Sequence, residues 1–215
     1  MLTVSVAAIA LLGTGLVSVT EDVLDTEELV RADSPISRYL LEHRERWLTT
    51  SMDVITQLGS AVVLVPVLIA LGLVARRSQG TWRPAVFLAA TLGGASTISA
   101  LIKLMVARPR PSSGALIEAI GYAFPSGHST AAAAGWLAAA LVAGLLTRSS
   151  ALRLSLLAGA LLIIVLVGIS RVYLGVHAAT DVLGGWALGG LWVVLVLTAR
   201  SLLTARRGAS DGALV

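Results

Sequence analysis

The sequence predicts an all-α polytopic membrane protein, a six-transmembrane-helix bundle with a short interfacial helix between its first two spans. The first reason is composition. Of the 215 residues, 56% are hydrophobic and 13% are charged, whereas a soluble domain carries about 25% charged residues. The second is the mean hydropathy of +0.88, which leaves too little polar surface to coat a particle in water. These values exclude a soluble enzyme.

Six uncharged stretches supply the expected spans. They cover residues 2–20, 54–75, 84–102, 129–147, 154–170 and 182–199. A helix that crosses the hydrocarbon layer needs about 17 to 25 apolar residues, and each stretch is long enough. Transmembrane strands would alternate in polarity, but these stretches are continuous runs of Leu, Val, Ala and Ile. The first stretch lacks a basic start and a clear cleavage pattern, so we expect a retained helix rather than a signal peptide.

The basic residues predict which loops face the cytoplasm. Loops 76–83 and 148–153 and the tail after residue 199 hold eight arginines and a single acid. The 21–53 connection instead dilutes four arginines with nine acids. By the positive-inside rule the first group is cytoplasmic and 21–53 is outside. We therefore expect a multi-pass protein of the cytoplasmic membrane with both termini in the cytoplasm. The isoelectric point of about 10.3 reflects this topology, and we expect no nucleic-acid partner.

Apolar residues in the outer connection recur at helical spacing. They are Ile36, Leu40, Leu41, Trp47 and Leu48. The pattern predicts a short interfacial helix within residues 36–48. Both a lid that guides lipid and a plain connector resting on the bilayer fit it. No repeat or change in composition divides the chain, so we expect a single membrane-embedded domain over residues 1–215.

Three polar segments interrupt the apolar chain at the edges of the stretches. They are 103–111, which contains Lys103, Arg108 and Arg110; 125–128, Pro-Ser-Gly-His; and 170–181, which contains Ser170, Arg171, His177 and Asp181. In an up-and-down bundle that starts in the cytoplasm, the ends of the third and fifth helices and the starts of the fourth and sixth all face outward. We therefore expect the three segments to meet in one site on the extracytoplasmic face.

The residue types in these segments suit a phosphoryl group. The cations are Lys103, Arg108, Arg110 and Arg171. An ammonium and several planar guanidinium forks match the oxygens of a phosphate. Ser126 and Gly127 stand where a helix begins, so backbone N–H groups and the positive end of the helix dipole favour an anion there. The missing side chain of Gly127 permits close approach.

Two histidines have separate expected tasks. His177 and Asp181 lie four residues apart, so on a helix the carboxylate keeps one ring nitrogen protonated while the other attacks phosphorus. His128 is then the acid for the leaving oxygen and the base for the attacking water. A zinc site formed by the same three residues is the rival chemistry. The four nearby cations oppose a divalent ion, so we expect no metal and no cofactor.

The other polar residues of the outer side have simpler interpretations. We expect Asp53 to cap the second span, Glu118 to be a loop charge and His43 to be a hydrated loop residue. The chain contains no cysteine, which excludes disulfides, thiolate metal ligands and a thiol nucleophile.

The three segments resemble, in order and spacing, the signature of the type 2 phosphatidic acid phosphatase family of membrane lipid phosphatases. Lys103 with Arg110-Pro111 matches Lys-x6-Arg-Pro, residues 125–128 match Pro-Ser-Gly-His, and residues 170–181 match Ser-Arg-x5-His-x3-Asp. Soluble bacterial acid phosphatases and vanadium haloperoxidases have a similar signature. The six spans favour the membrane enzymes.

This resemblance implies a metal-independent reaction through a phosphohistidine. It implies catalysis by His177, His128 and Asp181, and phosphate binding by Lys103, Arg110, Ser126, Gly127 and Arg171. Arg108 lies outside the signature, so its role as a further phosphate donor is a hypothesis from proximity.

The implied substrate is a lipid phosphate monoester or a lipid pyrophosphate in the bilayer. We favour undecaprenyl pyrophosphate or a related polyprenyl carrier, followed by phosphatidic acid and phosphatidylglycerol phosphate. The alternatives are a lipid phosphotransferase that uses the same site and a non-catalytic lipid-binding or transport protein. The sequence predicts no particular oligomeric state.

Overall fold

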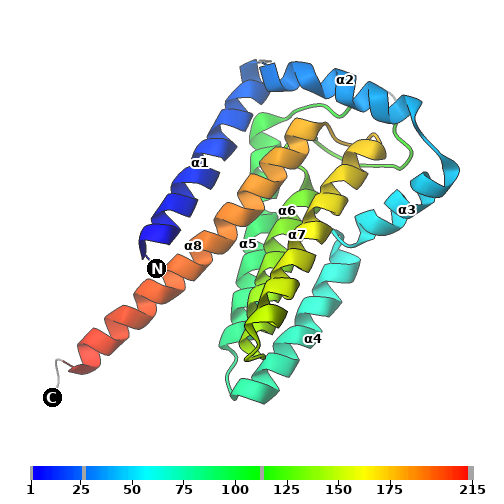
Figure 1. Ribbon diagram of the computed structural model, residues 1–215. Helices are drawn as coiled ribbons and strands as arrows, with labels where there is room; N and C mark the ends of the chain where they lie inside the picture. Colours follow the sequence, from blue (N-terminus) through cyan, green and yellow to red (C-terminus); the bar gives the residue numbers. More distant parts are fainter. Residues whose placement is uncertain (1, 26–27, 112–113, 213–215) are drawn as a thin grey trace.

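The computed structural model describes residues 2–25, 28–111 and 114–212, which form eight helices (Figure 1). These are α1 (Leu2–Asp25), α2 (Glu28–Glu42), α3 (Arg46–Gln57), α4 (Ala61–Gln79), α5 (Arg83–Val106), α6 (Gly127–Leu145), α7 (Ser150–Tyr173) and α8 (Ala179–Gly212). None of the three ranges contains a strand. The predicted all-α class is therefore confirmed.

Six of these helices are long and apolar enough to cross a membrane. The spans are Thr3–Asp25, Ala61–Gln79, Arg83–Val106, Gly127–Leu145, Ser150–Tyr173 and Ala179–Ala205. The predicted number of spans is therefore confirmed. Some helices run beyond the uncharged stretches, because a charged side chain at a helix end reaches the polar layer without ending the helix. The first helix, for example, continues through Glu21 and Asp22 to Asp25.

The predicted second span, residues 54–75, is wrong at its start. Its first residues belong to α3, which ends at Gln57, and the membrane-crossing helix α4 begins only at Ala61. Ser60 occupies the N-cap position of α4. Asp53 is exposed within α3 and does not cap the span. Counting uncharged residues missed this helix break because no charge marks it.

Close packing accompanies the break between α3 and α4. A Cβ atom added to Gly59 would lie 2.6 Å from Cγ1 of Val167 and 2.9 Å from the carbonyl oxygen of His128. Only glycine fits so near α7 and the first turn of α6. The break therefore brings the end of α3 directly against the helices that carry polar residues of the second and third segments.

The outer connection forms two helices where one short helix was predicted within 36–48. α2 and α3 are separated at residues 43–45 and lie across one end of the bundle (Figure 1). Leu40 of α2 and Leu48 and Met52 of α3 pack against a buried cluster that includes Tyr173 and Leu174. The apolar pattern was therefore correct that this connection is helical and wrong about continuity: Leu40 and Leu48 pack inward, whereas Ile36 and Trp47 are exposed. As expected, His43 and the loop residue Glu118 are exposed.

Helix α6 lies at the centre of the bundle and contacts α4, α5, α7 and α8. Its buried face is rich in alanine, including Ala132, Ala133, Ala134 and Ala138. In lipid, helices associate through close packing of small residues. This composition lets four neighbours approach one helix.

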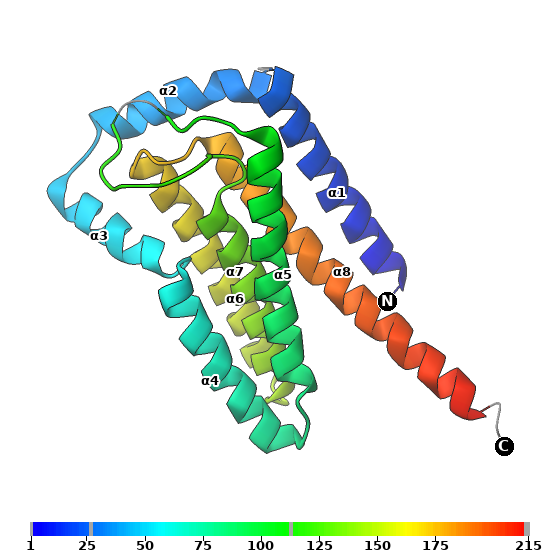
Figure 2. The same ribbon diagram turned by 180° about the vertical axis from the view of Figure 1, so that it is seen from behind.

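Two glycines of α8 make the closest of these approaches. A Cβ atom at Gly185 would lie 2.8 Å from the carbonyl oxygen of Ser126, and one at Gly189 would lie 2.6 Å from that of Thr130. The backbone N–H of Ser126 also donates to the carbonyl of Asp181 at 2.8 Å. The start of α6 is thereby held against the start of α8, and Figure 2 shows the connection from α5 to α6 at this same end.

Candidate active site

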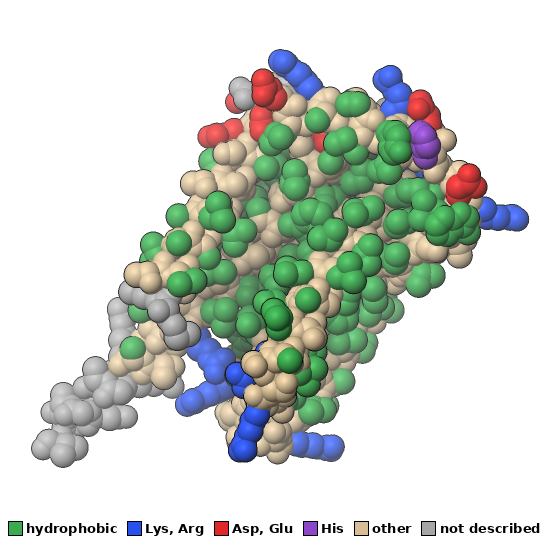
Figure 3. All heavy atoms as spheres, viewed as in Figure 1, with side chains coloured by type: hydrophobic (Ala, Val, Ile, Leu, Met, Phe, Trp, Pro, Cys, Tyr) green, Lys and Arg blue, Asp and Glu red, His purple; other side chains and the backbone are tan. Residues whose placement is uncertain are grey.

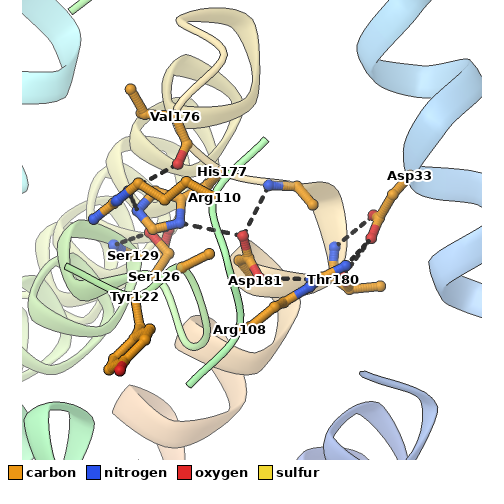
Figure 4. Close-up of polar contacts among 12 residues, drawn as sticks. Asp33, Arg108, Arg110, Tyr122, Ser126, Ser129, Val176, His177, Thr180 and Asp181 are labelled. Atoms are coloured by element: carbon orange, nitrogen blue, oxygen red, sulfur yellow. Dashed lines mark hydrogen bonds and ion pairs between the residues drawn. The ribbon is translucent and has the colours of Figure 1, made fainter. Parts of the chain in front are cut away.

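The structure brings the three polar segments together at the end of the bundle covered by α2 and α3 (Figure 4). Backbone hydrogen bonds join them. Ala123 donates to the carbonyl of Arg108 at 2.8 Å, and Leu116 donates to that of Leu174 at 2.9 Å. The first and third segments are therefore both tied by backbone hydrogen bonds to the α5 to α6 connection, which leads into the second segment.

His177 and Asp181 form the buried centre of this cluster. Their exposed fractions are 2% and 0%. Nδ1 of His177 lies 3.3 Å from Oδ2 of Asp181, and the same oxygen accepts the backbone N–H of Ala178 at 2.9 Å. The predicted pairing occurs, but the assumed helical geometry is wrong because α8 begins at Ala179 and His177 lies in the turn before it.

The environment of His177 keeps its ring neutral. Burial is the main cause that lowers the pKa of His177; the hydrogen bond and the charge of Asp181 oppose it, the cations of Arg171 and Arg110 add to it, and the net pKa is about 4. A ring that is neutral at physiological pH and gives its Nδ1 proton to the Asp181 hydrogen bond exposes a lone pair on Nε2. That atom is available as a nucleophile.

Arg110 borders this nitrogen. Its Nη1 lies 3.2 Å from Nε2 of His177 and donates to the carbonyl of Val176 at 2.8 Å. Its Nε and Nη2 donate to the carbonyls of Gly121 and Ile120 at 2.9 and 3.0 Å. Burial lowers the pKa of the Arg110 guanidinium, which still titrates far above neutral pH. The connection thus fixes a cation next to His177.

Lys103 extends from the last turn of α5 into the same loop. Its Nζ donates to the carbonyls of Tyr122 and Ala123 at 2.9 and 3.1 Å. An ammonium group has three N–H donors, so one remains for another acceptor. Lys103 and Arg110 together hold the segment from Ile120 to Ala123 by its carbonyl groups.

Arg171 is the most deeply buried cation of the site. It is 4% exposed, and its Nη1 donates to Oγ1 of Thr56 on α3 at 2.8 Å. Its Nε is buried without a hydrogen-bond partner among the described residues. A buried unpaired donor is costly in a native protein. An oxygen acceptor at this position would satisfy it.

The start of α6 supplies the third side of the site. Oγ of Ser126 accepts the N–H of Ser129 at 3.4 Å and its hydroxyl proton at 3.0 Å, so Ser126 is the N-cap. Helix geometry leaves the first N–H groups of α6 without intrahelical acceptors. Half-buried His128 lies on this first turn, close enough to His177, Arg110 and Arg171 to interact with them electrostatically.

Gly127 leaves space beside Lys103. A Cβ atom built on Gly127 would meet only Cε of Lys103, at 3.8 Å, which is an ordinary van der Waals distance. The protein itself therefore does not require glycine here. A ligand that approaches the start of the helix would require it.

Arg108 is not the unpaired cation that the phosphate-donor hypothesis assumed. Its Nη1 donates to Oδ1 of Asp181 at 2.6 Å and to Oγ1 of Thr180 at 2.7 Å, and its Nη2 donates to Oδ2 of Asp33 at 2.9 Å. Burial lowers the pKa of Arg108, but the charges and hydrogen bonds of Asp181 and Asp33 outweigh burial and raise it. The two carboxylates use both terminal nitrogens of this guanidinium.

Sequence reasoning missed three residues that touch the site. Asp33 and Thr180 bind Arg108, and Thr56 binds Arg171. Asp33 stands in a segment rich in acids, and Thr56 in an uncharged stretch, so no local signal separated either from its neighbours. Thr180 directly precedes a signature residue, and that adjacency was the one available hint.

The charges of the site are unequal. Lys103, Arg110 and Arg171 have no carboxylate within salt-bridge distance in the described part of the chain, whereas Arg108 has two. Placing one buried and two half-buried cations together is unfavourable without a counter-charge. The arrangement suits a bound anion with several oxygens.

Comparison with known proteins agrees with this chemistry. The profile of the PAP2 superfamily matches residues 84–204, more than half of the chain and the whole set of signature residues. The chain belongs to the PAP2 superfamily. Phosphatidylglycerophosphatase B of Bacillus subtilis is 37% identical over 176 residues, which are 80% of this chain and 85% of that protein.

Solved structures of PAP2 phosphatases have the same architecture. The crystal structure of the transmembrane PAP2-type phosphatidylglycerolphosphate phosphatase from Bacillus subtilis superposes with a TM-score of 0.81 at 31% identity, over 90% of this chain and 96% of that one. The crystal structure of Aquifex aeolicus LpxE gives 0.62 at 24% identity, over 78% and 95%, and supports the fold alone. The resemblance drawn from the three segments is confirmed, and this PAP2 protein is a membrane-embedded lipid phosphatase.

Proposed function

We propose that this PAP2 phosphatase moves the terminal phosphoryl group of a lipid first to His177 and then to water. The observation that carries the proposal is the placement of Nε2 of His177. Its ring partner Nδ1 is held by Asp181, and the Arg110 guanidinium lies 3.2 Å from Nε2 itself. Nucleophile, orienting carboxylate and neutralising cation are the elements of covalent phosphoryl transfer.

In the first step the lone pair on Nε2 of His177 attacks phosphorus, and the bond between phosphorus and the lipid oxygen breaks. Protonated His128 gives its proton to that leaving oxygen. In the second step neutral His128 takes a proton from water, whose oxygen attacks phosphorus and breaks the P–N bond. Inorganic phosphate leaves, and both histidines return to their starting states.

The unpaired cations stabilise the phosphoryl oxygens in both steps. Lys103, Arg110 and Arg171 supply the charge, and the start of α6 at Ser126 and Gly127 supplies backbone N–H donors. Such preorganised groups provide the largest share of catalysis when charge spreads over equatorial oxygens. The buried Nε of Arg171, which has no partner in the described part of the chain, supports this assignment.

The first candidate substrate is phosphatidylglycerol phosphate, because the similar Bacillus subtilis sequence and the similar Bacillus subtilis crystal structure are both named for it. A polyprenyl pyrophosphate such as undecaprenyl pyrophosphate is the second candidate. Three cations without carboxylate partners suit the greater negative charge of a pyrophosphate. In either case the headgroup enters at the end of the bundle while the tail stays in the bilayer.

The proposed reaction takes place on the extracytoplasmic side, with residues 1–215 acting as one unit and both termini in the cytoplasm. In the view of Figure 3, acidic and basic side chains mix at the end that carries α2, and the opposite end is basic. Arg76 and Arg77 in the last turn of α4 and Arg83 at the start of α5 belong to that opposite end. The positive-inside rule favours this orientation.

A panel of lipid phosphates tests the proposal. Purified protein in detergent, with EDTA present, is expected to release phosphate from phosphatidylglycerol phosphate, phosphatidic acid or undecaprenyl pyrophosphate, and the fastest of the three identifies the substrate class. Replacing His177 with Ala should reduce kcat by at least about a thousandfold. The matched control is His43→Ala, since His43 is exposed and bonds only to its own helix.

Three outcomes would overturn parts of the proposal. Full turnover by the His177→Ala variant would show that His177 is not the nucleophile. Loss of wild-type activity on chelation would reinstate a metal. Transfer of the phosphoryl group to an added alcohol in preference to water would make the enzyme a phosphotransferase.

A further inference from the structure

A buried acid links the interfacial helix α2 to the centre of the site. Asp33 is 6% exposed, while its neighbours Ala32 and Ser34 are exposed. Its Oδ1 accepts the backbone N–H of Thr180 at 3.0 Å, and its Oδ2 accepts the hydroxyl proton of Thr180 at 2.6 Å. Figure 4 shows Asp33 reaching from α2 to the first turn of α8.

Arg108 lies between Asp33 and Asp181. Its Nη2 bonds to Asp33 at 2.9 Å and its Nη1 to Asp181 at 2.6 Å, and its side chain is 16% exposed. A planar guanidinium holds two acceptors at fixed angles. The position of one carboxylate therefore fixes the direction in which Arg108 holds the other.

The consequence appears at Asp181. Arg108 occupies Oδ1, while Oδ2 receives the N–H of Ala178 and faces Nδ1 of His177. Both carboxylate oxygens of Asp181 are thus engaged in hydrogen bonds, and rotation of this carboxylate would break two or more of them. Asp33 also offsets the charge of Arg108, which leaves Asp181 a stronger anion toward the His177 ring.

A cavity of about 520 Å³ lies beside this network, between α2 and the start of α8. Its lining includes Ser34 and Ser37 of α2 as well as Asp33, Arg108 and Asp181. The space shows that α2 is not packed tightly along this side. The bonds from Asp33 are therefore a localised connection between α2 and the site rather than part of a continuous packed core.

We propose that Asp33 and Arg108 are positioning residues that hold Asp181 in the orientation in which it binds His177, and that Arg108 takes no part in binding the substrate phosphate. This inference rests on the proposed function, because it concerns how His177 is oriented for attack. Groups that orient a ligand residue through a second hydrogen bond typically change activity about 10- to 100-fold when they are replaced.

Asp33→Asn is the main test. The amide keeps the shape of the side chain and one oxygen acceptor while removing the charge. With a lipid phosphate substrate, kcat is expected to fall about 10- to 100-fold, whereas KM and inhibition by inorganic phosphate stay within about twofold. Glu42→Gln, an exposed acid on the same helix, is the matched control and should keep full activity.

Thr180 offers a second pair of variants that preserves all charges. Thr180→Val removes the hydroxyl that joins Asp33 and Arg108, and Thr180→Ser keeps it. We expect a lower kcat for Val and near-normal kcat for Ser. Thermal unfolding in detergent shows that each variant is folded, so a Val variant as active as the Ser variant would count against the network.

The decisive comparison places Asp33→Asn in an Asp181→Asn background. If Asp33 acts through Asp181, the second change adds no further loss of kcat. An equal loss in both backgrounds would mean a general structural role and would overturn the inference. Arg108→Lys tests the second part of the proposal, that Arg108 does not bind the substrate phosphate. A parallel rise in KM and in the inhibition constant of phosphate would make Arg108 a phosphate ligand and would contradict it.

The failure of this inference can be distinguished from failure of the proposed function. A wild-type protein that hydrolyses no lipid phosphate would reject the function itself. An active wild type with a fully active Asp33→Asn variant would reject the network alone.

Discussion

At the scale of single residues, burial and hydrogen bonding give the two ring nitrogens of His177 different tasks. Burial disfavours the charged ring, and Asp181 binds Nδ1, so the proton stays on the side away from Arg110. The same carboxylate is itself held by Arg108 and Ala178. Reactivity at Nε2 therefore depends on bonds made several atoms away.

The titration of His177 can be measured directly. Its pKa is lowered to about 4, mainly by burial, so the ring is expected to become protonated only below that pH. Nitrogen NMR of ¹⁵N-histidine-labelled protein in detergent, with the resonance assigned from a His177→Gln variant, gives the midpoint. A midpoint near the ordinary value of 6.5 would contradict the buried, neutral ring.

This shift also predicts how stability depends on pH. The folded-state pKa of His177 lies below the unfolded value, so the unfolded chain binds the proton first as the pH falls. The contribution of the neutral His177 ring to the free energy of unfolding is intact above about pH 6.5 and is lost progressively as the pH falls to about 4. Denaturation midpoints measured across this window should decrease as the pH is lowered. The decrease should be smaller in the His177→Gln variant than in the wild type.

Gly127 allows ligand binding to be tested without disturbing the fold. Because an added Cβ atom would lie 3.8 Å from Lys103, Gly127→Ala should fold normally. The methyl group would meet a bound phosphate, so we expect KM and the inhibition constant of inorganic phosphate to rise about tenfold, equivalent to ~1.4 kcal/mol. Gly15→Ala, whose Cβ meets no atom within 4 Å, is the control. Equal phosphate inhibition in Gly127→Ala and the wild type would remove the helix start from the binding site.

The sequence predicted which residues lie together better than it predicted how they are hydrogen-bonded. The signature brought Lys103, Arg110, Arg171 and the two histidines to one place because spacing and parity determine which helix ends meet. It could not assign Arg108 or Asp33, since their pairing spans 75 residues and depends on how α2 lies over the site. Long-range ion pairs leave no periodic pattern in a single sequence.

At the scale of helices, the contact between α6 and α8 aligns the two halves of the site. α6 carries His128 on its first turn, and α8 carries Asp181 on its own. Gly185 and Gly189 stand four residues apart on the face of α8 that touches α6. Small residues at this spacing permit backbone contact between helices in lipid.

Two adjacent glycines test this contact. A Cβ atom at Gly189 would lie 2.6 Å from the backbone oxygen of Thr130, while one at Gly190 would lie 3.5 Å from the flexible end of Leu12. Gly189→Ala should destabilise the protein by about 1–3 kcal/mol, and Gly190→Ala should be neutral. Unfolding in mixed micelles measures both. Equal stability of the two variants would mean that α8 can move away from α6 at no cost in free energy.

Helix boundaries were harder to predict than helix number. Hydropathy identified all six spans because the bilayer sets a minimum length for each. It merged the end of α3 with α4, since residues 54–60 contain no charge and the break depends on contact between Gly59 and its neighbours Val167 and His128. Tertiary packing, which local composition does not encode, determined that boundary.

At the scale of the whole molecule, the account places substrate chemistry at one membrane surface. The connection from α5 to α6 and the interfacial helices lie at one end, and the turn between α4 and α5, flanked by Arg76, Arg77 and Arg83, lies at the other (Figure 1). In the proposed reaction a headgroup would reach the first end without leaving the membrane surface, and its tail would remain in the hydrocarbon layer. Orientation of the chain then decides which leaflet supplies the substrate.

Single cysteines report this orientation, because the natural chain has none. Glu118→Cys lies in an exposed part of the connection from α5 to α6, and Arg148→Cys lies in the exposed turn before α7. In intact cells a membrane-impermeant maleimide should label position 118 and not position 148. Position 114 is a poor choice, because a side chain there would lie 2.3 Å from Leu41. Labelling at 148 alone would place the site in the cytoplasm.

The most direct test of the central claim is capture of phosphate on His177. A lipid pyrophosphate labelled in its terminal phosphate is mixed with the His128→Gln variant and quenched in alkali. The variant lacks the base for the second step, while the phosphate leaving group of a pyrophosphate depends less than an alkoxide on the acid for the first step. The account predicts a labelled protein with phosphate on His177 by mass spectrometry, and no label when His177 is replaced by Ala. A His177→Ala variant that is still labelled, or that turns over lipid at the wild-type rate, would contradict it.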